Sequence, residues 1–351
     1  MSGKSAEALG STGPAQERSG VASGDADLNS VRASVVVVTF NAGPGFEALL
    51  DGLSSQETDF DYEVVVVDSG STDGTVELAR RYGASVHRVS RAEFDHGATR
   101  DLGLSLSRGE YAALVVQDAV PLDERWLAAM VETLDKDELT AGVYGRQVPR
   151  RESSPLTRVL VNSWPTAGLE RREQFAGDPN LYGSLRPAER RSLATFDNVN
   201  SCVRRSVWEE IPFGRASFGE DLRWGKRVVE AGYKLVYEPR SAVFHSHERG
   251  AAYDLRRHFV NQKLLLDLFG LALVPNSVSL LLGVLRSTAF LYRRLRREAK
   301  ARGGAARLAF LAGKYALCSQ VGAYLGVKNR RLAAISPRLS AGLDGFLSRH
   351  I

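Results

Sequence analysis

Polar side chains that can bind ligands follow three apolar runs in this 351-residue chain, at residues 35–38, 64–67 and 114–116. These side chains are Thr39, Asn41, Asp68, Gln117 and Asp118. Continuous apolar runs are typical of parallel strands that are buried on both faces. In open α/β sheets, the residues just past the strand ends line the ligand crevice. The pattern therefore predicts a nucleotide site at the carboxyl edge of a parallel sheet.

Asp118 and His245 are the candidate metal ligands. A carboxylate at a strand end can hold a divalent cation, which would neutralise charge on a leaving diphosphate. His245 and His247 flank Ser246 at another expected strand end. Because alternate residues of a strand point to the same side, both imidazoles are expected to face the crevice. The alternative is that each histidine is hydrogen-bonded in the core, and a zinc site would need more ligands.

Glu220 and Asp221 follow Gly219 at the start of an expected helix. The helix dipole favours acidic residues in a first turn, which is one explanation of both. The other is that Asp221 is a general base, which takes a proton from an acceptor hydroxyl as that oxygen attacks a sugar's anomeric carbon. His96 and Arg100 lie near another helix start, where a diphosphate could bind. An ordinary turn with an exposed arginine would also explain that segment.

Strands and helices alternate along the first part of the chain. Strands are expected at 33–39, 62–67, 85–89, 111–117 and 141–148. Helices are expected at 44–55, 73–83, 97–107 and 122–135. This alternation predicts an α/β fold with a mostly parallel central sheet flanked by helices. Residues 150–196 have no strong period, and so long an irregular stretch inside a domain is usually functional.

The remaining segments are predicted from composition and pattern. A short strand is expected at 198–204, a helix at 220–231, two short strands within 234–245 around Pro239, and mainly helices over 250–330. Residues 1–30 are rich in Gly, Ser and Ala, so we expect a disordered tail without a signal peptide. Cys202 and Cys318 form no metal or redox motif, which favours a reducing compartment.

The C-terminal region is basic. From Arg286 onward it holds 14 Lys and Arg against two Asp and Glu, although the whole chain carries only +5. The apolar segment 270–285 leads into it, and Pro275 and Asn276 interrupt a run shorter than the ~20 residues that spanning needs. Apolar surface beside arginines fits an anionic membrane surface better than nucleic acid. The alternative is that these helices pack on the catalytic domain or on a second copy in a homo-oligomer.

Seven short motifs are each weak alone, but their joint order is specific. They are VTFN (38–41), VDSGSTD (67–73), FDHGATRDLG (94–103), QDA (117–119), NVNS (198–201), FGED (218–221) and HSH (245–247). Through these motifs the chain resembles the family 2 inverting glycosyltransferases with the GT-A fold, and most of all their rhamnosyltransferase-type branch. The resemblance implies a GT-A catalytic domain over 31–250, followed by a helical C-terminal region over 251–351.

The resemblance also implies roles for the matching residues. The donor would contact Thr39, Asn41, Asp68, Arg100, Gln117 and Asp118. Asp118 and His245 would hold Mg²⁺ or Mn²⁺, and Asp221 would be the catalytic base. Beside these, Trp164, Asn200 and Glu220 are expected to bind the acceptor, since an aromatic face in the irregular stretch suits a sugar ring, although it also suits a core.

The chain departs from the family pattern at two positions. The general GT-A motif is Asp-x-Asp, whereas here Ala119 follows Asp118, which leaves one carboxylate for the metal. Asp101 stands where the rhamnosyltransferase-type branch commonly has Asn, which would change the charge near the diphosphate.

The expected reaction is transfer of a sugar to a hydroxyl of a lipid-linked or polysaccharide acceptor. The favoured sugar is rhamnose, with dTDP-rhamnose as its donor. The expected setting is cell-surface glycan assembly by a cytoplasmic protein at the inner face of the membrane. Another donor such as UDP-galactofuranose would use the same residues. A sugar-1-phosphate nucleotidyltransferase would need Lys or Arg in the loop 41–45, which has neither. A non-catalytic scaffold would not need Asp118, Asp221 and His245 together.

Overall fold

The computed structural model describes residues 31–298 and 304–349, so the expected disordered tail lies outside the described residues. Its centre is a nine-stranded sheet in the order β3-β2-β1-β4-β8-β6-β9-β5, with β7 paired to β9. The strands are β1 (Val31–Thr39), β2 (Asp61–Asp68), β3 (Ser85–Arg88), β4 (Tyr111–Val116), β5 (Val120–Pro121), β6 (Thr140–Val148), β7 (Arg172–Gln174), β8 (Asn200–Arg204) and β9 (Lys234–Phe244).

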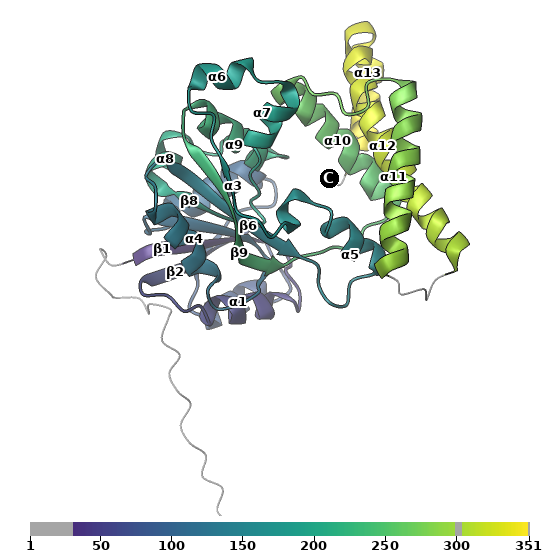
Figure 1. The fold of residues 1–351 in the computed structure, drawn as a ribbon. Coiled ribbons are helices and arrows are strands. Elements are labelled where there is room, and N and C mark those ends of the chain that lie inside the picture. Colours follow the sequence, from purple (N-terminus) through teal and green to yellow (C-terminus); the bar gives the residue numbers. More distant parts are fainter. Residues whose placement is uncertain (1–30, 299–303, 350–351) are drawn as a thin grey trace, which may run out of the picture.

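Helices flank this sheet, and a group of C-terminal helices stands beside it (Figure 1). The helices around the sheet are α1 (Phe46–Ser54), α2 (Thr75–Arg81), α3 (His96–Leu106), α4 (Trp126–Asp135), α8 (Arg205–Glu210) and α9 (Glu220–Glu230). The expected α/β architecture with a helical C-terminal extension is therefore confirmed.

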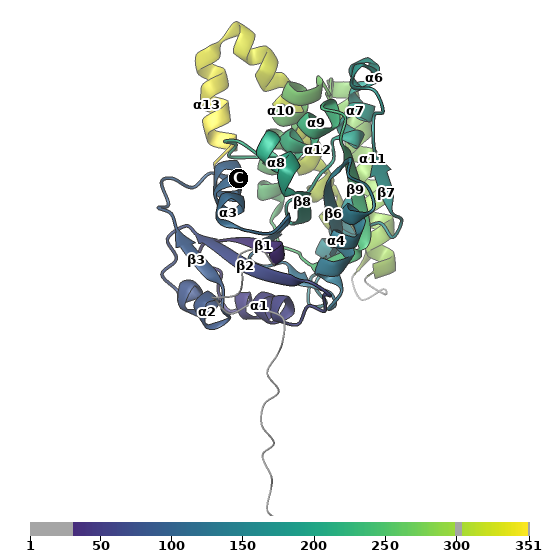
Figure 2. The ribbon, with the colours of Figure 1, turned by 90° about the vertical axis from the view of Figure 1, so that its left-hand side faces the viewer.

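Valine-rich strands form the parallel part of the sheet. β1 runs parallel to both β2 and β4, and Val36 pairs with Val65 on one side and Leu114 on the other. Alternate valines enter opposite cores, since Val35 packs with residues of α1, α2 and α4, whereas Val36 packs with residues of α3 and α9. Figure 2 shows α1 and α2 below the sheet and α3 above it. Burial on both faces explains why these strands are continuous apolar runs.

The sheet as a whole is mixed, because β8 lies between β4 and β6 and runs antiparallel to both. β6 and β9 are parallel again. β9 is one strand, where two short strands were expected. Its pairing with β6 skips residues 239–241 between the partners of Gly145 and Arg146. Pro239, which has no N–H to donate to a neighbouring strand, lies in this irregularity, so the strand continues past it.

The irregular stretch is built from short elements. They are α5 (Pro155–Val161), the 3-10 helix η1 (Pro165–Ala167), β7, α6 (Pro179–Ser184) and α7 (Pro187–Leu193). Each of its helices begins with a proline, which suits the first helical position because it needs no N–H there. Such closely spaced starts explain why no long period appears in the sequence.

The C-terminal region is helical, as expected for 250–330. It contains α10 (Ala251–Phe269), α11 (Ser277–Glu298), α12 (Ala305–Ile335) and α13 (Pro337–Leu347). α12 packs closely on α10, since a Cβ at Gly322 would lie 2.1 Å from the carbonyl oxygen of Leu255. Among the described helices, none is both long enough and apolar enough to cross a membrane.

Candidate active site

Three side chains that can ligate a metal converge where β4 and β9 end. They are Asp118, His245 and His247, and their ligand atoms lie within 4.8 Å of one another. His247 Nε2 is 3.4 Å from Asp118 Oδ2, and the Nε2 atoms of the two histidines are 3.1 Å apart. One carboxylate and two imidazoles at this spacing suit a divalent cation. The structure thus brings the two expected ligands together and places His247 beside them.

The surroundings favour the neutral form of both imidazoles. Burial lowers the pKa of His245 to about 4, and it also lowers the pKa of His247. A neutral imidazole is the form that binds metal. His245 Nδ1 lies 2.8 Å from Gln147 Oε1, and Gln147 Nε2 donates to Asp197 Oδ2 at 2.6 Å. Arg150 also lies near Asp118, with its guanidinium 3.8 Å from the Asp118 carboxylate.

Asp221 occupies the first turn of α9, directly after Gly219 and Glu220. Gly219 has a φ of 67°, and a Cβ there would lie 2.2 Å from Leu264 Cδ2, so this turn requires glycine. The Asp221 side chain is only partly exposed. Burial, together with the negative charges of Glu220 and Asp197, raises the pKa of Asp221 to about 8. A carboxylate with a raised pKa is a stronger base, as a general base near neutral pH must be.

Arg100 and Glu220 form a buried ion pair at the start of α9. Their N–O distance is 3.1 Å, and the side chains are 9% and 8% exposed. Arg100 also donates to the carbonyl oxygen of His96 at 3.0 Å, and Asn198 Nδ2 donates to Glu220 Oε1 at 3.3 Å. The contacts fix α9 against α3. Arg100 and Glu220, expected to contact donor and acceptor, are thus placed where they position the helix that carries Asp221.

Asp68 organises the loop that follows β2. Its carboxylate accepts from the N–H groups of Gly70 and Ser71, and from the hydroxyls of Ser71 and Thr39 at 2.5 and 3.0 Å. Asp68 is 0% exposed and Thr39 is 1% exposed. Thr39 and Asp68, which were expected to contact the sugar donor, are therefore buried under the loop after β2 and hold its conformation.

Asn41 and Gln117 brace the neighbouring loop. Asn41 is exposed and has a φ of 43°, and its Oδ1 accepts from the N–H of Thr72 at 2.9 Å. Gln117 makes two bonds to the backbone of Phe40, accepting from its N–H at 2.8 Å and donating to its carbonyl at 3.3 Å. The ends of β1, β2 and β4 are thus tied together, which leaves Asn41 and Phe40 at the surface of the expected donor site.

The two other residues expected at the acceptor lie in different surroundings. Asn200 is 1% exposed, and its amide accepts from Trp126 Nε1 at 2.7 Å and donates to the carbonyl of Ser241 at 3.0 Å. These bonds give Asn200 a role inside the sheet. Trp164 precedes η1 and is 41% exposed, so its ring remains accessible.

Sequence reasoning did not single out Gln147, Arg150 or Asp197. A weak signal existed for each, because Gln147 and Arg150 lie at the end of the expected strand 141–148 and Asp197 directly precedes the NVNS motif. Gln147 and Arg150 thus lie at a strand end, the same kind of position that marks Asp68 and Asp118, and this position is the signal that predicts them.

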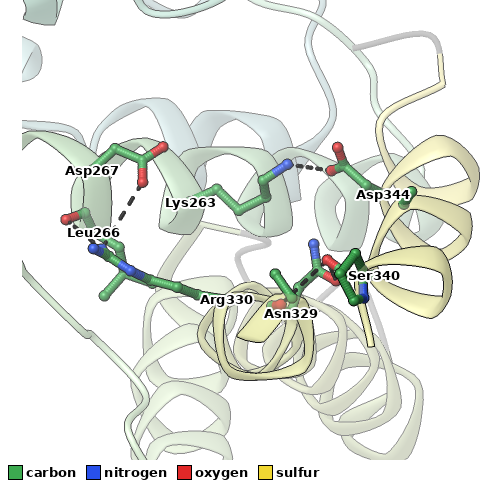
Figure 3. A pocket seen from close by; sticks show the side chains of 10 residues that line it. Lys263, Leu266, Asp267, Asn329, Arg330, Ser340 and Asp344 are labelled. Carbon is green, nitrogen blue, oxygen red and sulfur yellow. Dashed lines mark hydrogen bonds and ion pairs between the residues drawn. The ribbon is translucent and has the colours of Figure 1, made fainter. Parts of the chain in front are cut away.

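A separate cavity of about 310 Å³ lies among α10, α12 and α13 (Figure 3). At its wall Lys263 pairs with Asp344, and Arg330 donates to the carbonyl of Leu266 at 2.9 Å. None of its lining residues belongs to the expected site. The cavity is therefore distinct from the residues expected to form the active site.

The comparison with known families identifies the class of protein to which this site belongs. Residues 34–196 match the family described as "Glycosyl transferase family 2". The chain carries a family 2 glycosyltransferase domain. The matched segment includes Asp68 and Asp118, whereas Asp221 and His245 lie beyond its end, so the expected site of this glycosyltransferase extends past the matched segment.

Several known proteins are similar to this glycosyltransferase. The O-antigen chain rhamnosyltransferase RfbN of Salmonella typhimurium is 28% identical over 235 residues, which cover 65% of this chain and 71% of the relative. The O-antigen chain rhamnosyltransferase WbaN of Salmonella anatum is 27% identical over 231 residues, with coverages of 64% and 70%. Among solved structures, the mannosyltransferase PcManGT from Pyrobaculum calidifontis, in complex with GDP-Man and Mn²⁺, aligns with a TM-score of 0.44 and 20% identity, covering 93% of this chain and 87% of that one.

Proposed function

We propose that this glycosyltransferase moves a sugar from a nucleoside diphosphate to an acceptor hydroxyl, with inversion at the anomeric carbon. The observation that carries the proposal is the convergence of Asp118, His245 and His247, together with the partly buried carboxylate of Asp221. In this reaction Asp221 takes the proton of the acceptor hydroxyl as its oxygen attacks the sugar. A single base suffices, because no covalent bond forms between sugar and enzyme.

We propose that Asp118, His245 and His247 hold a divalent cation. Such a cation supplies positive charge to the diphosphate of the donor. Two nitrogen ligands beside one oxygen favour Mn²⁺ over Mg²⁺, which prefers a shell of oxygen ligands. Arg150 adds a fixed positive charge beside Asp118, and it also donates to the carbonyl of Ser246 at 2.8 Å, so its guanidinium is held in place.

We propose dTDP-rhamnose as the donor and a lipid-linked or polysaccharide glycan of the cell surface as the acceptor. The two Salmonella relatives, both described as O-antigen chain rhamnosyltransferases, support this choice. Asn41 is an exposed side chain at the expected donor site, and Trp164 offers an exposed aromatic face for an acceptor sugar.

A donor panel tests the proposed reaction. The protein would be incubated with dTDP-rhamnose, UDP-galactofuranose, UDP-GlcNAc, UDP-glucose and GDP-mannose, each with Mn²⁺, Mg²⁺ or EDTA. We would record donor binding and slow release of nucleoside diphosphate, which needs no known acceptor. Selective, Mn²⁺-dependent engagement of dTDP-rhamnose supports the proposal. Preference for another donor changes the product, and engagement of none contradicts the proposed reaction.

Two variants, each at an aspartate in the first turn of a helix, extend this test. Asp221→Asn should still bind the donor but lose release of nucleoside diphosphate, because an amide cannot take the proton. Asp254→Asn is the matched control, since Asp254 lies in the first turn of α10 and burial also raises its pKa. Full activity in Asp221→Asn would remove Asp221 as the base.

We propose that α11 contacts an anionic membrane surface. Val278, Leu281 and Leu285 lie at helical spacing and are 68%, 61% and 58% exposed. Exposed arginines follow on the same helix, among them Arg286 and Arg293. In Figure 1, α11 stands on the side of the molecule away from the sheet. An apolar face beside arginines fits the headgroup region of an anionic bilayer, and would hold the enzyme peripherally at the inner face of the membrane, near lipid-linked acceptors.

Vesicle sedimentation tests this contact. The protein should sediment with vesicles of phosphatidylglycerol and phosphatidylcholine but much less with phosphatidylcholine alone, because the arginines need anionic headgroups. The double variant Leu281→Glu and Leu285→Glu should lose binding. Leu169→Glu is the control, since Leu169 is 72% exposed in the irregular stretch. If the double variant instead dissociates a dimer and leaves vesicle binding unchanged, the face is a contact between copies of the chain.

A further inference from the structure

Gln147 is a buried residue beside the three proposed metal ligands, Asp118, His245 and His247. The oxygen and the nitrogen of its side-chain amide each make one hydrogen bond. Gln147 is 2% exposed, near the end of β6. Its Oε1 lies 2.8 Å from His245 Nδ1, and its Nε2 donates to Asp197 Oδ2 at 2.6 Å. Gln147 therefore joins a candidate metal ligand to an acid whose charge acts on Asp221.

Asp197 fixes which way round the Gln147 amide lies. A carboxylate can only accept hydrogen bonds, so the amide NH₂ must point to Asp197 and the carbonyl oxygen must point to His245. Asp197 is itself held, because its Oδ1 accepts from the N–H of Val199 at 3.0 Å. The orientation of the glutamine is thus set from the side away from the metal ligands.

The amide in turn fixes the tautomer of His245. Since Gln147 Oε1 can only accept, the proton of the neutral imidazole must be on Nδ1, and Nε2 is left with a free lone pair. That Nε2 is the atom which lies 3.1 Å from His247 Nε2 and 3.8 Å from Asp118 Oδ1. A metal-binding histidine is commonly oriented in this way by an acceptor on its other nitrogen.

We propose that Gln147 is a positioning residue, which prepares His245 for metal binding by holding its proton on Nδ1. The inference rests on the proposed metal site and adds a residue that orients one of its ligands. Asp197 acts one step further out, through the bond that orients Gln147. The expectation differs for these two positions. Asp197→Asn keeps one oxygen that can accept from Gln147, although it then loses the bond from the Val199 N–H, whereas Gln147→Leu leaves His245 Nδ1 without an acceptor.

The first experiment is binding of Mn²⁺ alone, without donor, followed by calorimetry or by the loss of its paramagnetic resonance signal. Gln147→Leu should raise the dissociation constant about 10- to 100-fold, the usual cost of removing an outer partner of a metal ligand. Asp197→Asn should change it much less. The matched control is Gln174→Leu, because Gln174 is also buried but bonds Tyr144 and backbone carbonyls such as that of Thr195.

The second experiment reads the tautomer directly in the metal-free wild-type protein. Two-bond ¹H–¹⁵N spectra of histidine-labelled protein distinguish the two neutral tautomers, and a His245→Gln variant would assign the signal. We expect the Nδ1–H form, and the Nε2–H form would overturn the inference whether or not the Gln147 variant folds.

The outcomes separate this inference from the proposed function. If wild-type protein does not bind Mn²⁺, the proposed metal site fails and the role of Gln147 fails with it. If wild type binds and Gln147→Leu binds equally well, the metal site stands and only the inference is overturned. An equal loss in Gln147→Leu and Gln174→Leu would also overturn it, since a general loss of stability would then explain both.

Discussion

The raised pKa of Asp221 predicts how the reaction rate depends on pH. A general base works only when it is deprotonated, and burial with two neighbouring acids raises the pKa of this carboxyl to about 8. Activity should therefore be lost as pH falls through that value. With a pKa of about 8, only about a tenth of the enzyme carries the base form at pH 7, so kcat/KM should rise roughly tenfold from pH 7 to its plateau.

The charge of Asp197 offers a way to move this profile. Asp197 is one of the negative charges that raise the pKa of Asp221. Asp197→Asn removes that charge and keeps one oxygen, which can accept from Gln147 in place of the Val199 N–H, so the pKa of Asp221 should fall and the rising limb should shift to lower pH. Release of nucleoside diphosphate from the preferred donor, at saturating metal and over about pH 6 to 9, measures both profiles.

Two results would refute this reasoning. A limb that stays at the same pH in Asp197→Asn would mean that the two carboxylates do not interact. A limb that persists in the residual activity of Asp221→Asn would mean that another group titrates.

Three further changes have expected outcomes. Gly145→Ala should lower the free energy of unfolding, measured in urea titrations, by about 1–3 kcal/mol or more, because its Cβ would lie 2.0 Å from a backbone carbonyl oxygen of β9. The control Gly45→Ala has open space around it and should be neutral or slightly stabilising. Asp101→Asn should cost about 1–3 kcal/mol in the same assay, because the carboxylate accepts from three donors and an amide cannot satisfy all of them. His247→Ala should weaken Mn²⁺ binding, and His258→Ala on α10 should leave it unchanged, as calorimetry would measure.

The parallel strands could be predicted from the sequence because burial on both faces requires an apolar residue at each successive position. Val35 and Val36 face opposite cores, so both must be apolar, and a continuous run results. The insertion of β8 between β4 and β6 could not be predicted in the same way. Strand order there depends on long-range pairing, such as Leu114 with Ser201, which no local period records.

The sequence located polar residues at strand ends, but it could not tell which of them face a ligand. Asp68 and Asn200 illustrate the limit, because the chain itself supplies all the hydrogen-bond partners described above for both side chains. A carboxylate that accepts from its own loop and one that accepts from a nucleotide have the same local pattern. Asp118 differs in that its side chain remains 27% exposed, a property that depends on how the strands assemble.

The C-terminal helices contact residues that are next to the proposed site residues in the sequence. Leu264 of α10 lies against Gly219, the residue that starts the turn carrying Asp221, and Arg257 of α10 places its guanidinium 5.0 Å from the ring centre of Phe218. Tyr315 of α12 donates to the carbonyl of Arg249, which follows His247 by two residues. Because these helices contact the residues next to the proposed base and next to the proposed metal ligands, a contact that moved α10 or α12 would act on the neighbours of both proposed groups.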